Sequence, residues 1–148
     1  MEKMKPNKGQ PSADKDVKLD EGSLTEEQIR LLLKSLPFDI TFVDEKDKVC
    51  FYSAGKHRIF PRSPAVIGRS VQNCHPPKSV HVVEKIVKSF KEKTKDKAEF
   101  WIQQGEQFIH IRYFPVYDEK GDYKGVIEVS QEVSGIRSLK GQRRILDW

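Results

Sequence analysis

The chain has 148 residues, 36% hydrophobic and 33% charged, with 27 Lys and Arg against 22 Asp and Glu and a formal charge of +5. This length corresponds to one domain. The apolar runs are shorter than the ~18 residues that a membrane-spanning helix needs. The first residues lack the apolar core of a signal peptide, so secretion is not expected. Because its 2 cysteines cannot form a disulfide scaffold, we expect a cytoplasmic protein with reduced thiols. Neither a membrane nor a nucleic acid is expected as partner, since the apolar runs are short and the positive charges are spread over a solvated surface.

The first 22 residues are predicted to be a disordered tail, because polar and charged residues dominate it and its charges cancel. Order is predicted to begin at Ser23, since Ser23 followed by Glu26 matches a capping box. Apolar residues then recur at helical spacing until Pro37 ends the helix. These residues are Leu24, Ile29, Leu32, Leu33 and Leu36. A helix this short needs a docking surface, which is either the domain's own sheet or a second subunit.

From Phe38 the apolar period changes to two, which is typical of strands. Residues 39–44 and 48–53 are predicted to be two strands that form a hairpin. The following segment, residues 54–74, contains several prolines and glycines among scattered apolar residues. We expect irregular backbone with single helical turns there, and such segments often carry function.

A longer helix is predicted after Pro76 and Pro77, because proline suits the first turn of a helix. Its apolar stripe consists of Val83, Ile86, Val87 and Phe90. Three more strands are predicted at residues 98–103, 107–116 and 123–131, joined by hairpin turns, and a helical pattern runs from Ser134 toward Trp148.

This order of elements predicts an α+β fold, a five-stranded antiparallel sheet with helices packed over one face and flanking N- and C-terminal helices. The long connection between the second and third strands must cross that face. A small-molecule cavity is expected between this connection and the sheet.

Cys74 and His75 are the first candidate site residues, because thiolates and imidazoles bind metals and cofactors. No metal site is predicted, since adjacent side chains rarely bind one metal and a closed zinc site needs four ligands. The alternative is that His75 starts the long helix while Cys74 packs beneath it. His81 is a candidate axial ligand for haem, although it shares a helix side with Lys85 and Lys88.

The fourth strand supplies a second candidate set. Alternation places one mixed set of side chains on one face: Phe108, His110, Arg112 and Phe114. These residues either line a pocket for a carboxylate-bearing or aromatic ligand, or face solvent while the alternate set (Ile109, Ile111 and Tyr113) forms the core. A basic cluster is either an anion site or ordinary surface: His57, Arg58, Arg62 and Arg69. No catalytic residues are predicted, because no base, nucleophile and orienting group share a defensible spacing.

Several motifs resemble the PAS sensory fold. Residues 67–69, Ile-Gly-Arg, resemble the start of the short helices of that family, and residues 114–121, followed by Gly125, resemble its "xPVxDxxGxxxG" strand pair. Residues 36–40, 71–79 and 100–103 resemble a prokaryotic PAS subfamily that often follows hemerythrin-like domains.

The resemblance covers residues 23–145 and implies a single sensory domain that binds a small ligand or cofactor. Such a module would signal through its terminal helices to a partner or second subunit, as a homodimer; the alternative is a ligand-free dimerisation module. Flavin is not expected, because Cys74 lies three residues further from Gly68-Arg69 than the reactive cysteine of light-sensing relatives. Haem remains open.

Overall fold

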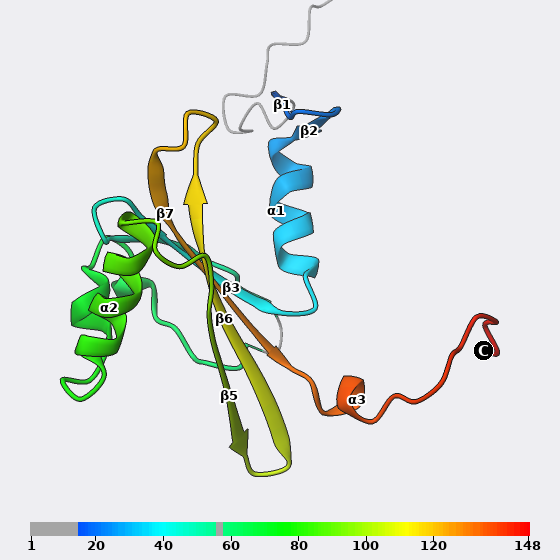
Figure 1. Cartoon of the computed structure of the whole chain (residues 1–148). Helices are drawn as coiled ribbons and strands as arrows, with labels where there is room; N and C mark the ends of the chain where they lie inside the picture. The colour runs from blue at the N-terminus through cyan, green and yellow to red at the C-terminus, as the bar shows by residue number, and fades with distance from the viewer. Residues whose placement is uncertain (1–14, 56–57) are drawn as a thin grey trace, which may run out of the picture. The chain divides into compact units, whose positions relative to one another are not determined.

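The computed structural model describes residues 15–55 and 58–148 (Figure 1), and the chain divides into two units after Leu36. The first unit contains β1 (Asp16–Lys18), β2 (Ser23–Thr25) and α1 (Glu26–Ser35). β1 and β2 pair antiparallel. β1 lies within residues 1–22, which were predicted to be disordered, and its backbone hydrogen bonds are satisfied by pairing with β2. Residues 1–14 lie outside the described residues.

Helix α1 has a capping box, but two residues later than predicted. Thr25 is the N-cap: its Oγ1 accepts the Gln28 amide at 3.1 Å, and its own amide donates to Gln28 Oε1 at 2.9 Å. Ser23 lies two residues before the N-cap, at the first position of β2, because the helix begins only at Glu26. The helix ends at Ser35, consistent with the restriction that Pro37 places on the residue before it.

The second unit contains the five-stranded antiparallel sheet, in the order β4-β3-β7-β6-β5. Its strands are β3 (Asp39–Asp44), β4 (Val49–Tyr52), β5 (Ala98–Gln104), β6 (Gln107–Tyr117) and β7 (Tyr123–Glu132). The predicted fold class is therefore confirmed. Between β4 and β5 the chain forms η1 (Pro64–Val66), η2 (Val71–Cys74) and α2 (Val80–Lys91), and α2 lies beside the sheet (Figure 1).

The inward side of the sheet is set by contacts between β6 and α2. The Tyr117 hydroxyl donates to the Phe90 carbonyl at 2.7 Å, and Phe90 is 1% exposed. Tyr113 lies on the same side of β6 and faces Val83 of α2 across a cavity. Because side chains alternate along a strand, the odd-numbered residues of β6 face α2 and the even-numbered ones face the opposite way.

The C-terminal helix is much shorter than predicted. α3 spans only Ser134–Arg137, and the chain beyond it is exposed, with Trp148 at 92% exposure. A short helix needs packing of an apolar face to persist, and Gly141 adopts a φ of +65° that a helix does not allow. Within residues 15–55 and 58–148, no helix has the length and apolar character needed to cross a membrane.

Candidate functional site

A small cavity lies between α2 and the inward side of the sheet. Its volume is about 40 Å³, and its walls include Val43, Val71, Val83, Ile86, Val87 and Val126. The polar groups at this cavity are Thr41, His75, Tyr113 and Glu128. A second hollow of about 20 Å³ shares several of these residues and adds Arg62 and Cys74. We call the two hollows together the α2 cavity.

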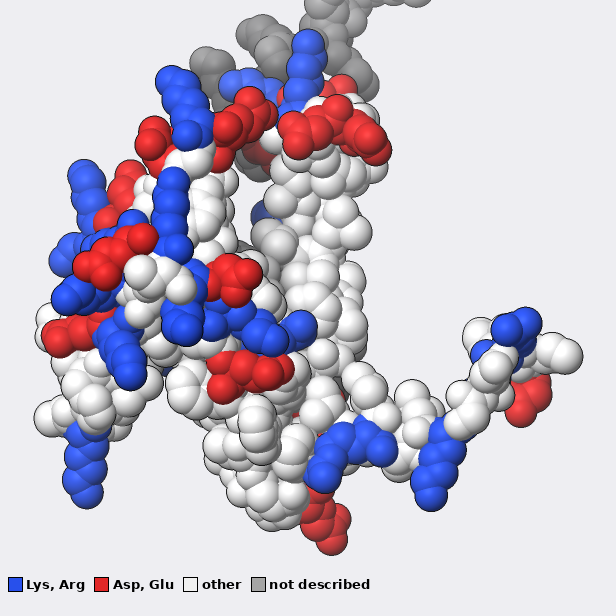
Figure 2. All heavy atoms as spheres, viewed as in Figure 1, with Lys and Arg blue, Asp and Glu red and all other residues white. Residues whose placement is uncertain are grey.

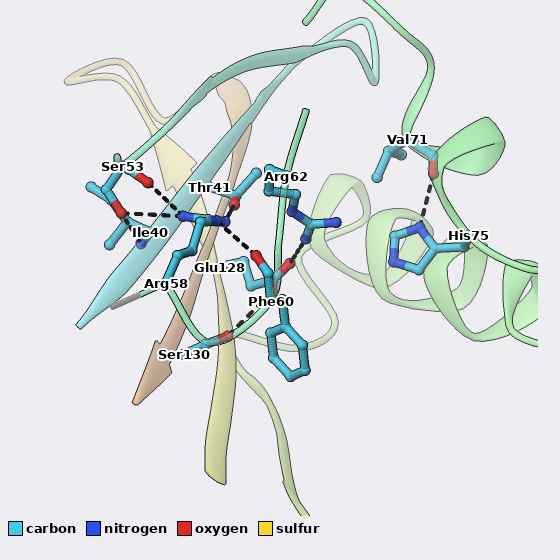
Figure 3. A network of polar contacts seen from close by, with 10 residues as sticks. All are labelled: Ile40, Thr41, Ser53, Arg58, Phe60, Arg62, Val71, His75, Glu128 and Ser130. Atoms are coloured by element: carbon cyan, nitrogen blue, oxygen red, sulfur yellow. Dashed lines mark hydrogen bonds and ion pairs between the residues drawn. The ribbon is translucent and has the colours of Figure 1, made fainter. Parts of the chain in front are cut away.

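Arg62 and Glu128 face one another at the polar end of the α2 cavity (Figure 3). Arg62 Nη2 lies 3.6 Å from Glu128 Oε2, and the two side chains are only 19% and 14% exposed. Glu128 Oε1 also accepts the Ser130 hydroxyl at 3.3 Å. Arg62 Nε is buried and has no hydrogen-bond partner among the described residues. The pair is therefore held loosely, and Arg62 keeps donors available for a further acceptor.

Arg58, by contrast, is fully engaged by the protein. Its guanidinium donates to the Ser53 carbonyl at 2.7 Å, the Ser53 hydroxyl at 3.3 Å, Thr41 Oγ1 at 3.0 Å and the Phe60 carbonyl at 2.9 Å (Figure 3). Burial is the main reason that the pKa of Arg58 is lowered. These bonds make Arg58 a structural residue that ties the segment after β4 to β3.

Cys74 and His75 both reach the α2 cavity through the single turn of η2. His75 Nδ1 lies 3.0 Å from the Val71 carbonyl. Since a carbonyl oxygen only accepts, Nδ1 carries the proton and Nε2 is an acceptor when the ring is neutral. Cys74 Sγ donates to the Ser70 carbonyl at 3.5 Å, so its thiol is occupied locally.

Tyr113 contributes a hydroxyl that stays protonated. Its pKa is raised, first because the side chain is buried and then because the Glu128 carboxylate lies nearby. A neutral phenol beside a carboxylate can donate one hydrogen bond and accept another.

The other predicted site residues lie away from the α2 cavity. His81 is exposed on α2. The even-numbered set of β6 points to the opposite side of the sheet, because Ile109 and Tyr113 occupy the side that faces α2. There His110 Nε2 lies 2.5 Å from Glu99 Oε2.

Two arginines complete this opposite side. Arg112 lies 5.6 Å from the ring centre of Phe114, and Arg137 lies 3.8 Å from that of Phe108. Of the two alternatives left open for β6, these four residues do not line the α2 cavity, and the alternate set is the one that faces α2.

Sequence reasoning missed Glu128, which lines the α2 cavity, and did not connect Arg62 or Tyr113 with it. One pattern could have found Glu128. It follows Val126 at a spacing of two within an apolar strand, which places an isolated carboxylate on a buried face. Arg58 and Arg62 belong to the basic cluster for which an anion site and ordinary surface were the two alternatives. Its His57 lies outside the described residues, and its Arg69 is exposed.

The α2 cavity does not fit haem or a flavin in this conformation. Its two hollows of about 40 and 20 Å³ are together well below the roughly 300–1,000 Å³ of pockets that hold larger ligands. His81, the candidate haem ligand on α2, does not line it. Among residues 15–55 and 58–148, no group of three or more His, Cys, Asp and Glu side chains is arranged to hold a metal ion.

The surface around α2 carries both signs of charge. Figure 2 shows Lys and Arg side chains interleaved with Asp and Glu over this part of the molecule. One such contact is the ion pair between Lys91 Nζ and Asp47 Oδ1, at 3.1 Å. The positive excess on this face is therefore not gathered into one basic patch.

Comparison with known proteins gives a consistent assignment. The PAS domain family matches residues 29–134. The crystal structure of a C-terminal domain from Streptococcus mutans is 32% identical, with a TM-score of 0.81, and the match covers 86% of this chain and 99% of that chain. No curated protein matches the sequence.

Two more distant structures share the fold alone. The PAS domain of a Colwellia psychrerythraea protein is 16% identical over 74% of this chain and 97% of its own, with a TM-score of 0.53. A sensory box sensor histidine kinase from Vibrio cholerae is 14% identical over 71% of this chain and 88% of its own, with a TM-score of 0.51. Since the family match spans most of the sheet and its helices, the chain belongs to the PAS domain family.

Proposed function

We propose that this PAS domain is a non-enzymatic sensory module whose α2 cavity binds a small molecule. The observation that carries the proposal is a cavity with aliphatic walls and an incompletely hydrogen-bonded Arg62–Glu128 pair at one end. Buried polar groups without partners are costly, so such a group is commonly completed by water or a ligand. The Arg62 guanidinium is the group here that a ligand would complete.

Strand β7 provides a route from the α2 cavity to the end of the domain. Glu128 lines the cavity, and Glu132, further along the same strand, accepts the amides of Ser134 at 2.9 Å and Phe108 at 3.1 Å. Ser134 is the first residue of α3. A ligand that alters the position of Glu128 would, through β7 and Glu132, change the position of α3, which follows the sheet.

The receiver of this change is proposed to be a partner segment or a second subunit. The Streptococcus mutans match is a C-terminal domain, which supports a module that works beside another domain. The sequence motifs suggest a hemerythrin-like domain as that neighbour. The free thiols of Cys50 and Cys74 support a reducing, cytoplasmic compartment.

The alternative proposal is a ligand-free dimerisation module. It is favoured by α1, on which Leu31 and Leu32 are 54% and 53% exposed. Exposed leucines side by side on an amphipathic helix are typical of a contact with another chain. In this case α1, and not the cavity, would carry the function.

Two measurements on the full chain separate these proposals. Native mass spectrometry of freshly purified protein, followed by a thermal-shift screen of small metabolites, tests for a ligand. Light scattering of the Leu32→Lys variant tests for a dimer. The sensory proposal expects a bound or stabilising small molecule that Leu32→Lys still binds. A chain that binds nothing in either assay and becomes monomeric with Leu32→Lys would support the dimerisation module instead.

A further inference from the structure

The charges and hydrogen-bonding groups of the α2 cavity restrict what it can bind. Its one cationic side chain, Arg62, and its one anionic side chain, Glu128, are both mostly buried and lie 3.6 Å apart. The described lining is therefore balanced in charge. A ligand with a net charge would meet a like charge at close range in a poorly solvated site, which is strongly unfavourable.

The unused hydrogen-bonding capacity is of two kinds. Arg62 Nε is a buried donor with no partner among the described residues. In the neutral ring, His75 Nε2 is an acceptor, because the Nδ1 proton points to the Val71 carbonyl. Glu128 adds carboxylate oxygens that only accept. The polar end is therefore complementary to a head group that accepts a hydrogen bond from Arg62 and donates one to His75 or Glu128.

The remaining walls fix the body of the ligand. Val43, Val83, Ile86 and Val126 are aliphatic. The two hollows of about 40 and 20 Å³ together have room for about four to six non-hydrogen atoms, since one water needs roughly 10–15 Å³. A branched chain of three or four carbons suits this shape better than a ring system.

We propose that the α2 cavity binds a short aliphatic molecule whose head group is neutral overall and both donates and accepts hydrogen bonds. A primary amide is the simplest such head, and a zwitterionic aliphatic amino acid is the second source of the same chemistry. This inference rests on the proposed sensory function and specifies its ligand. The carbonyl or carboxylate oxygen accepts from Arg62, and the amide or ammonium group donates to Glu128 or His75.

Three nearly isosteric probes test the proposal on the full wild-type chain: isobutyramide, which is neutral, isobutyrate, which is an anion, and isobutylamine, which is a cation. Valine serves as the zwitterion. Two-dimensional NMR titration gives the dissociation constants and shows which amides move. We expect isobutyramide or valine to bind about tenfold or more tightly than either ion, because each ion leaves a like charge unpaired. The amide-to-valine ratio distinguishes the two sources.

Removing one charge of the pair should reverse the preference. Glu128→Gln leaves Arg62 unbalanced and should let isobutyrate bind about tenfold or more tightly than it binds the wild type. Arg62→Met leaves Glu128 unbalanced and should favour isobutylamine instead. Matched controls are Glu84→Gln and Arg69→Met, which make the same charge changes at exposed positions and should leave the wild-type order of affinities intact.

Several outcomes overturn the proposal. Isobutyrate or isobutylamine binding the wild type more tightly than isobutyramide would do so, as would an equal change of preference in the exposed controls. The comparison of probe affinities for the wild-type chain needs no variant, so it tests the proposal even if a variant fails to fold. If no probe binds while native mass spectrometry finds another ligand, the ligand class is wrong and the sensory function stands; if no small molecule binds at all, both are wrong.

Discussion

The substitution Gly125→Ala would place a methyl group where β7 pairs with the end of β3. A Cβ on Gly125 would lie 2.1 Å from the Val43 carbonyl oxygen and 2.9 Å from Phe42 Cε2. The oxygen belongs to the backbone of β3, so it cannot rotate away, and the residue also has a φ of +145° that side chains rarely adopt. Overpacking costs about 1–3 kcal/mol and a strained backbone about 1–3 kcal/mol. We expect a total loss of roughly 2–6 kcal/mol.

Two control glycines separate the steric cost from the conformational one. Gly68 has a φ of +81° but open space where its Cβ would be, and Gly135 has open space and no positive φ. Urea unfolding should therefore show a loss of about 1–2 kcal/mol for Gly68→Ala and almost none for Gly135→Ala. If Gly125→Ala loses no more stability than Gly68→Ala, the close approach of β3 and β7 described here is wrong.

Four further substitutions test polar contacts. Tyr123→Phe should stabilise the fold by about 1 kcal/mol, because its buried hydroxyl has no hydrogen-bond partner among the described residues. Tyr117→Phe should destabilise it by a similar amount through loss of the bond to Phe90; urea unfolding that shows the same sign for both would contradict this. The pKa of Asp44 is lowered, mainly by the Lys48 amide, so its contribution to stability is present above the unfolded value of 3.8 and is lost as pH falls through the folded pKa. Asp44→Asn should flatten the dependence of unfolding free energy on pH in that acid range, and an unchanged slope would count against it. Arg58→Met should cost about 2–3 kcal/mol in urea unfolding, because it removes bonds from a charged donor to partly buried acceptors; a loss below about 0.5 kcal/mol, as expected for an exposed site, would show that these bonds do not matter.

The positions of the strands along the chain and the turn residues could be predicted because they depend on local pattern. Polar and apolar residues alternate from Asp39 to Phe42 before Val43 and the turn that follows Asp44, and the structure has a strand with the predicted bounds, Asp39–Asp44. The apolar stripe of α2 likewise follows from helical spacing, and Val87 and Phe90 are the buried residues of that helix. Periodicity of this kind reports which residues share a face.

The polar end of the cavity could not be predicted in the same way. Arg62 and Glu128 are 66 positions apart in the sequence, and their meeting depends on how the segment after β4 folds back over β7. Alternation along β6 correctly separates the set containing His110 from the set containing Tyr113, but it does not say which set faces α2. That choice depends on tertiary contacts such as the bond from Tyr117 to Phe90.

Strand β7 gives the domain different constraints at its two ends. At Gly125 the strand is pressed against β3, where even a methyl group has no space. Three residues later, Glu128 meets Arg62 through a single loose contact of 3.6 Å. Beyond it, Glu132 holds the amides of Phe108 and Ser134 where α3 begins. The Gly125 end is held by its tight contact with β3. A ligand that draws Glu128 toward or away from Arg62 would therefore shift the Glu132 end of β7. That shift would change the position of the segment that follows β7.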